Sequence, residues 1–164
     1  MLQIKFGDLF NYISPGDMIV HGCNCQGKMG SGFAAQIRKR FPVAYLEYSQ
    51  LYKEHGLILG EYIVVYSNNY CIFNAFTQEY YGRDPETVYV DYAAVEKSLK
   101  SSAKMAKTLK QHVYLPLIGG GLSNGDPAIL YRLFESIYAD IDATLILPDG
   151  YEIANLKQMK ETAS

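Results

Sequence analysis

Short apolar runs and longer segments of helical periodicity alternate along the whole chain. Strand-like runs cover residues 2–6, 18–21, 61–67, 70–77, 113–118 and 143–147. Apolar residues recur at helical spacing over residues 33–41, 43–55, 92–106 and 130–141. Regular alternation of strands and helices predicts an α/β fold of three α/β/α layers around a mixed, mostly parallel sheet.

Turn and cap residues refine this prediction. Asn68-Asn69 separates two strand-like runs and suits a two-residue hairpin, because asparagine tolerates positive φ. Asp91 and Asp126 are expected to cap helices, and Pro127 fits the first helical position. We expect one domain over residues 1–155, followed by a polar tail over residues 156–164.

Composition narrows the possible classes of function. The 164 residues, 49% of them apolar, suit one domain with a sizeable core. The net charge is −2, and Arg38-Lys39-Arg40 is the one basic run, so we expect no nucleic-acid partner. Residues 1–5 lead straight into a strand pattern, without a leader signature. No apolar run approaches membrane-spanning length, and we expect no membrane partner.

Cys23, Cys25 and Cys71 are the three cysteines of the chain. An odd number in a chain of this kind indicates reduced thiols rather than a disulfide framework. Reduced thiols favour a cytoplasmic location. The sequence contains no Cys/His cluster spaced for a metal, and we expect neither metal nor cofactor.

Two glycine-rich turns each follow a buried strand and precede a helix. The first is HGCNCQGKMGSG over residues 21–32, and the second contains Gly119-Gly120-Gly121. Parallel strands end at a common edge of a sheet, and uncovered backbone N–H groups at helix N-termini bind anions. Two such turns at one edge predict a site for a diphosphate; the alternative is that both are ordinary turns.

The segment GCNCQGKM misses the nucleotide-binding pattern G-x-x-x-x-G-K-[ST] by one residue. Met29 stands where a hydroxyl would ligate magnesium, and a thioether is a poor ligand for that ion. Gly30 and Gly32 also delay the helix. A magnesium-dependent NTPase is therefore disfavoured, and Lys28 is expected to be a solvated loop residue.

Three segments together resemble the macrodomain family, which binds ADP-ribose. They are Gly7-Asp8-Leu9-Phe10, residues 21–34 with Asn24 and a Gly-x-Gly element, and residues 118–122. They occur in the family's order over residues 1–150. The His-x-Cys-Asn-Cys form is particularly similar to the branch that contains the yeast-type ADP-ribose 1''-phosphate phosphatase.

The resemblance implies a contact for each part of the ligand. Asp8 and the Leu9 backbone would contact adenine, Tyr151 would pack on its ring, and Asn24 would bind the distal ribose. Thr77 and Gln78 would line the pocket for the distal ribose or a terminal phosphate. The phosphates and the distal ribose would contact the two loops at Met29, Gly30, Ser31, Gly32 and Phe33, and at Ile118, Gly119, Gly120, Gly121, Leu122 and Ser123.

For catalysis the resemblance implicates His21, together with Asn24. Histidine exchanges protons near neutral pH, so His21 would protonate the leaving oxygen or orient the attacking water. The alternatives are a neutral histidine that is hydrogen-bonded inside the sheet, and an Asn24 that only holds its own turn. An acidic partner is expected among three residues, Glu79, Asp84 and Asp126.

The resulting prediction is a phosphatase that converts ADP-ribose 1''-phosphate to ADP-ribose and phosphate. The alternatives are a hydrolase that removes ADP-ribose from acidic side chains of a modified protein, and a non-catalytic ADP-ribose-binding module. The family's glycohydrolase branch uses a lysine and an aspartate, for which this chain has Gln78 and Ser123. Glutamine cannot form a Schiff base, which argues against lysine-mediated chemistry.

Overall fold

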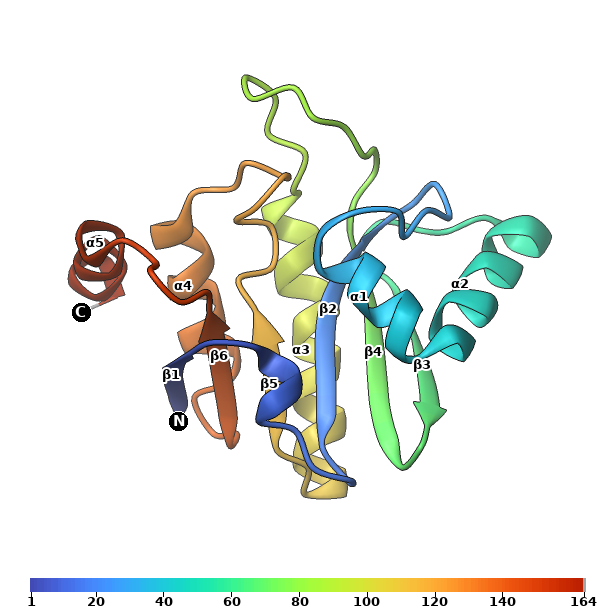
Figure 1. The fold of residues 1–164 in the computed structure, drawn as a ribbon, viewed down its shortest axis with the longest axis horizontal. Helices are drawn as coiled ribbons and strands as arrows, with labels where there is room; N and C mark the ends of the chain where they lie inside the picture. Colours follow the sequence, from blue (N-terminus) through green and yellow to red (C-terminus); the bar gives the residue numbers. More distant parts are fainter. Residues whose placement is uncertain (164) are drawn as a thin grey trace.

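The computed structural model describes residues 1–163, and their side chains except at residues 153, 154, 162 and 163. Six strands form one sheet in the order β1-β6-β5-β2-β4-β3, and all neighbours are parallel except β3 and β4. The strands are β1 (Leu2–Phe6), β2 (Met18–Asn24), β3 (Tyr62–Ser67), β4 (Tyr70–Gln78), β5 (Val113–Pro116) and β6 (Ala143–Leu147). The mixed, mostly parallel sheet is confirmed (Figure 1).

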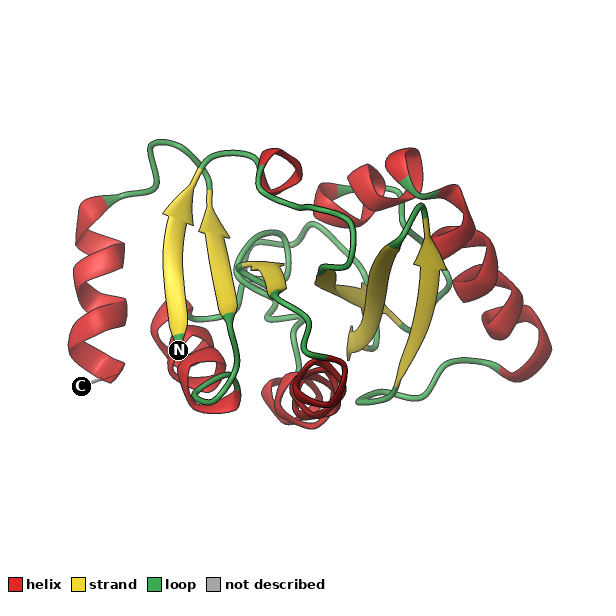
Figure 2. Ribbon diagram, turned by 90° about the horizontal axis from the view of Figure 1, so that it is seen from below, coloured by secondary structure: helices red, strands yellow, loops and turns green. Residues whose placement is uncertain are grey.

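Helices cover both faces of the sheet, which confirms the three layers (Figure 2). One face packs against α1, α2 and a short 3-10 helix, and the other against α3, α4 and α5. The helices are α1 (Gly32–Arg40), α2 (Pro42–His55), α3 (Tyr92–Leu109), α4 (Pro127–Ile137) and α5 (Ile153–Ala163), with the 3-10 helix η1 at Leu9–Asn11. None of the helices in the described chain is long and apolar enough to cross a membrane.

Strand β2 lies in the middle of the sheet and has a core on each side. Val20 joins the cluster under α3 and α4, whereas Ile19 joins the cluster under α1 and α2. Side chains alternate between the faces of a strand, so a strand buried on both sides has an unbroken apolar sequence. This explains the run that the sequence shows at residues 18–20.

The predicted hairpin turn and helix caps are confirmed, whereas two strands end at other residues than predicted. Asn68 and Asn69 have φ values of 51° and 66°, as a two-residue hairpin turn requires. Asp91 Oδ1 accepts a hydrogen bond from Ala94 N, and Asp126 Oδ1 accepts one from Ala128 N, both at 2.9 Å. Strand β2 continues three residues beyond the predicted end at residue 21, and β5 ends two residues before residue 118.

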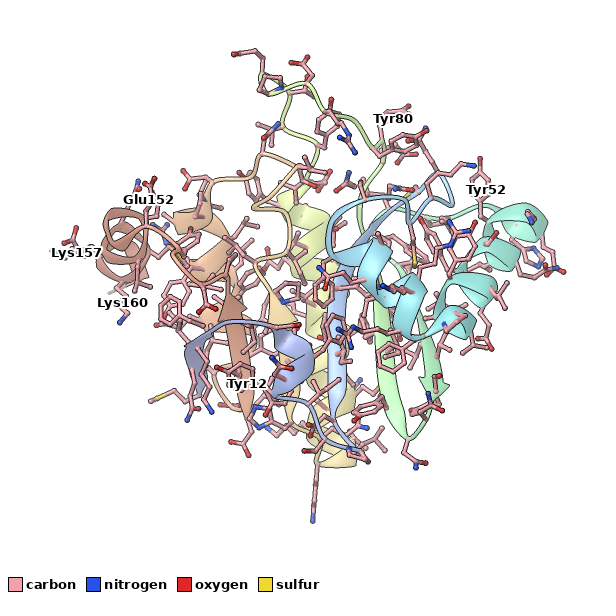
Figure 3. All side chains as sticks on the ribbon, viewed as in Figure 1. Tyr12, Tyr52, Tyr80, Glu152, Lys157 and Lys160 are labelled. Carbon is pink, nitrogen blue, oxygen red and sulfur yellow. The ribbon has the colours of Figure 1, made fainter. Side chains whose placement is uncertain are left out.

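The end of the chain forms α5, which lies beside α4 (Figure 1). The predicted boundary at residue 155 falls inside this helix. Met159 is fully buried, and Tyr151 Oη donates to its sulfur at 3.5 Å. Figure 3 shows Lys157 and Lys160 pointing away from the domain. Residues beyond 155 therefore contribute a side chain to the main core.

We expect Met159→Ala to lower the free energy of unfolding by about 2–5 kcal/mol, because it leaves a cavity in the core. Urea denaturation monitored by circular dichroism measures the change. Lys157→Ala, on the exposed side of the same helix, is the matched control and should change stability by no more than about 0.5 kcal/mol. Equal stability of the two variants would mean that α5 does not belong to the cooperative core.

Candidate functional site

A cleft of about 430 Å³ opens where β2, β4 and β5 end. Both glycine-rich turns line it, so the structure brings the two predicted loops together, as the parallel arrangement requires. Both loops lie at the upper edge of the sheet in Figure 1. The lining residues are Gly22, Cys23, Asn24, Lys28, Gly30, Ser31, Gly32, Phe33, Ala34, Thr77, Gln78, Tyr81, Gly82, Arg83, Pro116, Leu117, Ile118, Gly119, Gly121, Leu122 and Ser123.

Asn24 holds the first loop in shape. Its Oδ1 accepts hydrogen bonds from Gln26 N at 3.0 Å and from Lys28 N at 3.3 Å, and its Nδ2 donates to Lys28 O at 2.8 Å. Tyr48 Oη, from the buried face of α2, donates to Asn24 O at 2.6 Å. These hydrogen bonds correspond to the alternative in which Asn24 holds its own turn. An amide has two N–H donors, so one remains for a ligand in the cleft.

The Met29 side chain is buried, whereas Gly30 borders open space. The Met29 side chain is buried among Cys23, Tyr48 and Phe76, and it does not line the cleft. A Cβ added to Gly30 would meet no atom within 4 Å, because the residue borders open space. Met29 thus fixes the loop to the core while Gly30 leaves its backbone accessible.

The backbone N–H groups of residues 30–34 lack hydrogen-bond acceptors within the described chain. Helix α1 begins at Gly32, and the first N–H groups of a helix have no carbonyl one turn earlier. In the part of the chain that the structure describes, none of these five N–H groups donates to a protein acceptor. Ser31 precedes α1 and its hydroxyl makes no capping bond. These donors are available to an anion.

The second loop folds through its own turns. Gly120 N donates to Leu117 O at 3.0 Å, and Gly125 N donates to Gly119 O at 2.7 Å. Within residues 1–163, the N–H groups of residues 119 and 121–123 have no backbone acceptor. Unlike the first turn, this one does not open directly into a helix: α4 begins at Pro127, and the Asp126 carboxylate occupies its N-terminus. The second loop therefore offers amides without a helix dipole.

Gln78 and Ser123 are joined by a hydrogen bond. Ser123 Oγ donates to Gln78 Oε1, and Gln78 Nε2 donates to Tyr80 O at 2.8 Å. Thr77 lies beside them, and a Cβ on Gly22 would come within 2.6 Å of its Oγ1. The two positions that depart from the glycohydrolase pattern thus form one polar contact at the end of β4.

His21 is fully buried and does not line the cleft. Its Nε2 lies 2.5 Å from Asn74 Oδ1, and Asn74 Nδ2 donates to Ala44 O, so Nε2 is the donor. Burial lowers the pKa of His21 to about 4, which leaves the imidazole neutral at physiological pH. The ring packs beneath Phe33 with a centroid distance of 5.9 Å. This geometry supports the in-sheet alternative and not the direct proton transfer expected of His21.

The three acidic candidates also lie outside the cleft lining. Asp84 accepts hydrogen bonds from Glu86 N and Thr87 Oγ1, which lower its pKa. Asp126 caps α4, and Glu79 is exposed. Among the described residues that line the cleft, the charged side chains are two cations, Lys28 and Arg83. The charge of the lining therefore favours anionic ligands.

The residues expected at adenine are absent from the lining of the cleft. Asp8 Oδ1 accepts from Phe10 N at 3.0 Å and caps η1, while Leu9 is buried. Phe10 stacks on Phe33 at 5.4 Å, which connects η1 to the first loop. Tyr151 is held by its bond to Met159. Adenine contacts at Asp8, Leu9 and Tyr151 stay predictions, as does the role of Gly120, which is absent from the lining.

Sequence reasoning missed one whole wall of the cleft. Tyr81, Gly82 and Arg83 come from the loop between β4 and α3. The length of this loop is the sequence signal that indicates it. About a dozen residues follow β4 at the edge of the sheet where ligands bind, and long loops at such edges often carry function. Lys28 is an exposed loop residue, as expected, and it also lines the cleft. Gly22, Cys23, Ala34, Pro116 and Leu117 also line the cleft and were not predicted.

Cysteine and metal chemistry receive little support from this cleft. Burial raises the pKa of Cys23 far above neutrality, and burial followed by the nearby Glu79 charge raises that of Cys25 to about 11. Both thiols are protonated at neutral pH and are poor nucleophiles. The described residues contain no group of three or more His, Cys, Asp or Glu placed to share a metal ion.

Known proteins resemble this chain over most of its length. A model of the Macro domain family matches residues 20–133. An uncharacterized 17.5 kDa protein of Enterobacteria phage T4 is 31% identical, with 85% of this chain and 92% of that protein aligned. A protein of Candida albicans named ADP-ribose 1''-phosphate phosphatase is 28% identical, over 88% of this chain and 92% of its own length.

Solved structures show the same fold. A protein from Bacteroides thetaiotaomicron superposes with a TM-score of 0.78 at 27% identity, covering 90% of this chain and 99% of that chain. The macrodomain of Mycobacterium tuberculosis DarG gives a TM-score of 0.76 at 23% identity, covering 89% of this chain and 97% of that chain. These likenesses agree with the three-layer architecture described above.

We expect the buried, neutral His21 to make stability depend on pH. The pKa of His21 in the folded state is about 4, below the ordinary histidine value of 6.5. The contribution of His21 to stability is therefore full above pH 6.5 and is lost as pH falls toward 4. From pH 7.5 to pH 4.5 the loss should be roughly 2 to 3 kcal/mol. Urea unfolding at the two pH values measures it.

His21→Gln is the informative comparison, because glutamine keeps an N–H donor for Asn74 and does not titrate. This variant should lose roughly 2 to 3 kcal/mol less than the parent protein over the same pH interval. An equal loss in both proteins would show that His21 is accessible and protonated in the folded state.

Proposed function

The chain belongs to the Macro domain family, and we propose that it hydrolyses ADP-ribose 1''-phosphate to ADP-ribose and inorganic phosphate. The observation that carries this proposal is the composition of the cleft. Two loops present backbone N–H groups without acceptors among the described residues, and the charged side chains of the lining are Lys28 and Arg83. The relative of that name in Candida albicans aligns over nearly its whole length.

The charge of the substrate matches these donors. The diphosphate of ADP-ribose has two negative charges, and the amides of residues 30–34, 119 and 121–123, which have no backbone acceptor in the described chain, would bind it. A phosphate monoester at C1'' adds about −1.5 to −2 at neutral pH. Lys28 and Arg83 provide two positive charges for this additional group.

Hydrolysis of a phosphate monoester requires little covalent chemistry from the protein. Water attacks phosphorus, the bond between phosphorus and the C1'' oxygen breaks, and that oxygen takes a proton from solvent. Catalysis then rests on positioning the phosphate and stabilising its charge. The cleft offers amide donors and cations for both tasks, and the protonated Cys23 and the buried His21 need not take part.

The alternative hydrolase activity would remove ADP-ribose from acidic side chains of a modified protein. Gln78 and Ser123, which stand for the lysine and aspartate of the glycohydrolase branch, are occupied with each other. Release of ADP-ribose by lysine chemistry is therefore disfavoured. Removal by a water held against the substrate is the remaining form of this alternative, with an ADP-ribosylated protein as partner.

Binding without turnover is a second candidate, and one observation favours it. The described lining contains neither a histidine nor a carboxylate, the side chains that most often act as general acid or base. We further infer that the protein works in the cytoplasm, because Cys23, Cys25 and Cys71 are all free.

The proposed function is tested by two measurements on the same protein. Calorimetry with ADP-ribose should show binding, and incubation with ADP-ribose 1''-phosphate should release inorganic phosphate in a time-dependent, saturable manner. Binding with no phosphate release would leave the non-catalytic module. Release of ADP-ribose from a protein modified on acidic residues, without release of phosphate, would favour the other hydrolase. His21→Gln separates the roles of that residue, because lost release with intact binding would restore it as a proton donor.

Gly30→Val and Gly121→Val should weaken ADP-ribose binding at least about tenfold, because the new side chains enter open space in the cleft and cover the amides. Neither glycine has positive φ, so both variants should fold. Gly119→Val is less informative, because Gly119 has a φ of 80° and its added Cβ would lie 2.6 Å from Val90. Calorimetry measures the affinity.

Ala139→Val is the control for these two variants, because it places a valine at an exposed position just beyond α4 that does not line the cleft. It should bind ADP-ribose as the parent protein does. Melting temperatures of all three variants should stay within a few degrees of the parent. Unchanged affinity in a folded Gly30→Val protein would show that the first loop does not contact the ligand.

A further inference from the structure

The loop between β4 and α3, residues 79–91, rises above the rest of the molecule at the edge where the cleft opens (Figure 1). Its residues Tyr81, Gly82 and Arg83 line the cleft. Exposed side chains such as Tyr80 cover its outer surface (Figure 3). Hydrogen bonds from both glycine-rich loops hold this segment, and they determine where Arg83 lies.

The first attachment comes from the first glycine-rich loop. Gln26 Oε1 accepts a hydrogen bond from Tyr81 N at 2.9 Å, across 55 positions of sequence. The backbone of Gln26 is itself fixed, since its N–H donates to Asn24 Oδ1 at 3.0 Å. The residue two positions before Arg83 is thereby connected to the loop that offers amides to a phosphate.

The second attachment comes from the second glycine-rich loop. Asn124 Nδ2 donates to Asp84 O at 2.9 Å and to Thr87 O at 2.7 Å. Asn124 has a φ of 58°, a left-handed conformation that asparagine tolerates better than most residues. Its neighbour Ser123 accepts a hydrogen bond from Tyr89 N at 2.8 Å. The residue directly after Arg83 is therefore connected to the other loop.

The chain between these attachments has little freedom. Tyr89 Oη accepts from Asp84 N at 3.1 Å and lies over Gly82, where an added Cβ would come within 2.3 Å of it. A larger residue at position 82 would displace the Tyr89 ring. Arg83 is thus presented from a backbone that is fixed on both sides.

Among the described residues, Arg83 lacks the aromatic contacts that hold Arg38 and Arg40. Arg38 stacks on Tyr45 at 3.8 Å, and Arg40 stacks on Phe10 at 4.2 Å. For Arg83, which is exposed and borders the cleft, no ion pair or aromatic contact is found within the described chain. A guanidinium presents several N–H donors in a planar fork that matches phosphate oxygens.

We propose that Arg83 binds the phosphate on C1'' and thereby distinguishes the 1''-phosphate from ADP-ribose itself, and that Asn124 is a positioning residue for it. This inference rests on the proposed function, because it names the part of the substrate that Arg83 contacts. The diphosphate is assigned to the amides of the two loops, which both ligands share. Arg83 then acts on the one group in which substrate and product differ.

The test compares two ligands in one set of variants. Arg83→Ala should raise the KM for ADP-ribose 1''-phosphate at least about tenfold, since it removes a charge-assisted phosphate contact. Its Kd for ADP-ribose, measured by calorimetry, should change less than about twofold because the amide contacts remain. Arg132→Ala, an exposed arginine on α4, is the matched control and should change neither value.

Asn124→Gly tests the positioning role, because glycine accepts positive φ while the side-chain amide is lost. It should raise the same KM severalfold with ADP-ribose affinity retained. The double variant Arg83→Ala/Asn124→Gly should be no worse than Arg83→Ala alone, since Asn124 acts through Arg83. Additive losses, or a loss of ADP-ribose affinity in Asn124→Gly, would contradict this assignment.

Two results would overturn the Arg83 proposal. One is an equal loss of affinity for both ligands in Arg83→Ala, and the other is no loss for either. If the parent protein releases no phosphate, the proposed function fails, but the intact 1''-phosphate can then be titrated directly. A parent protein that prefers it over ADP-ribose, and an Arg83→Ala variant that has lost this preference, would still support the contact.

Discussion

Backbone N–H groups without an acceptor, at the edge where β2 and β5 end, are what the rest of the site depends on. They exist because parallel neighbours deliver their following loops to the same edge, and β2 and β5 are such neighbours. Glycines at residues 30 and 121 leave these groups uncovered. Water satisfies such donors in an open cleft and an anion can replace it, so the fold itself provides a site for an anionic ligand.

The chemistry of the site is divided between backbone and side chains. The backbone provides donors of fixed geometry, whereas Lys28 and Arg83 provide charge at the rim. No histidine or carboxylate of the described residues lines the cleft: His21 is neutral inside the sheet, and Asp126 caps α4. The described residues therefore favour binding and charge stabilisation over proton transfer.

Much of the fold follows from sequence pattern, because strands, caps and turns depend on local residues. The Asn68-Asn69 hairpin and the Asp91 cap are of this kind. The convergence of the two loops could also be predicted, since it follows from parallel topology. Burial of His21 could not, because helices packed against its face of β2 decide its exposure. Nor could Arg83, whose placement depends on hydrogen bonds between residues far apart in sequence.

The hydrogen bonds of Asn24 have a consequence for the thermodynamics of recognition. Three of them close the first loop, and Tyr48 joins it to the interior of α2. The loop therefore loses most of its conformational entropy when the chain folds rather than when a ligand arrives. Preorganisation of this kind lowers the entropic cost of association. Affinity at this edge of the sheet therefore depends on the stability of α2, a helix that does not line the cleft.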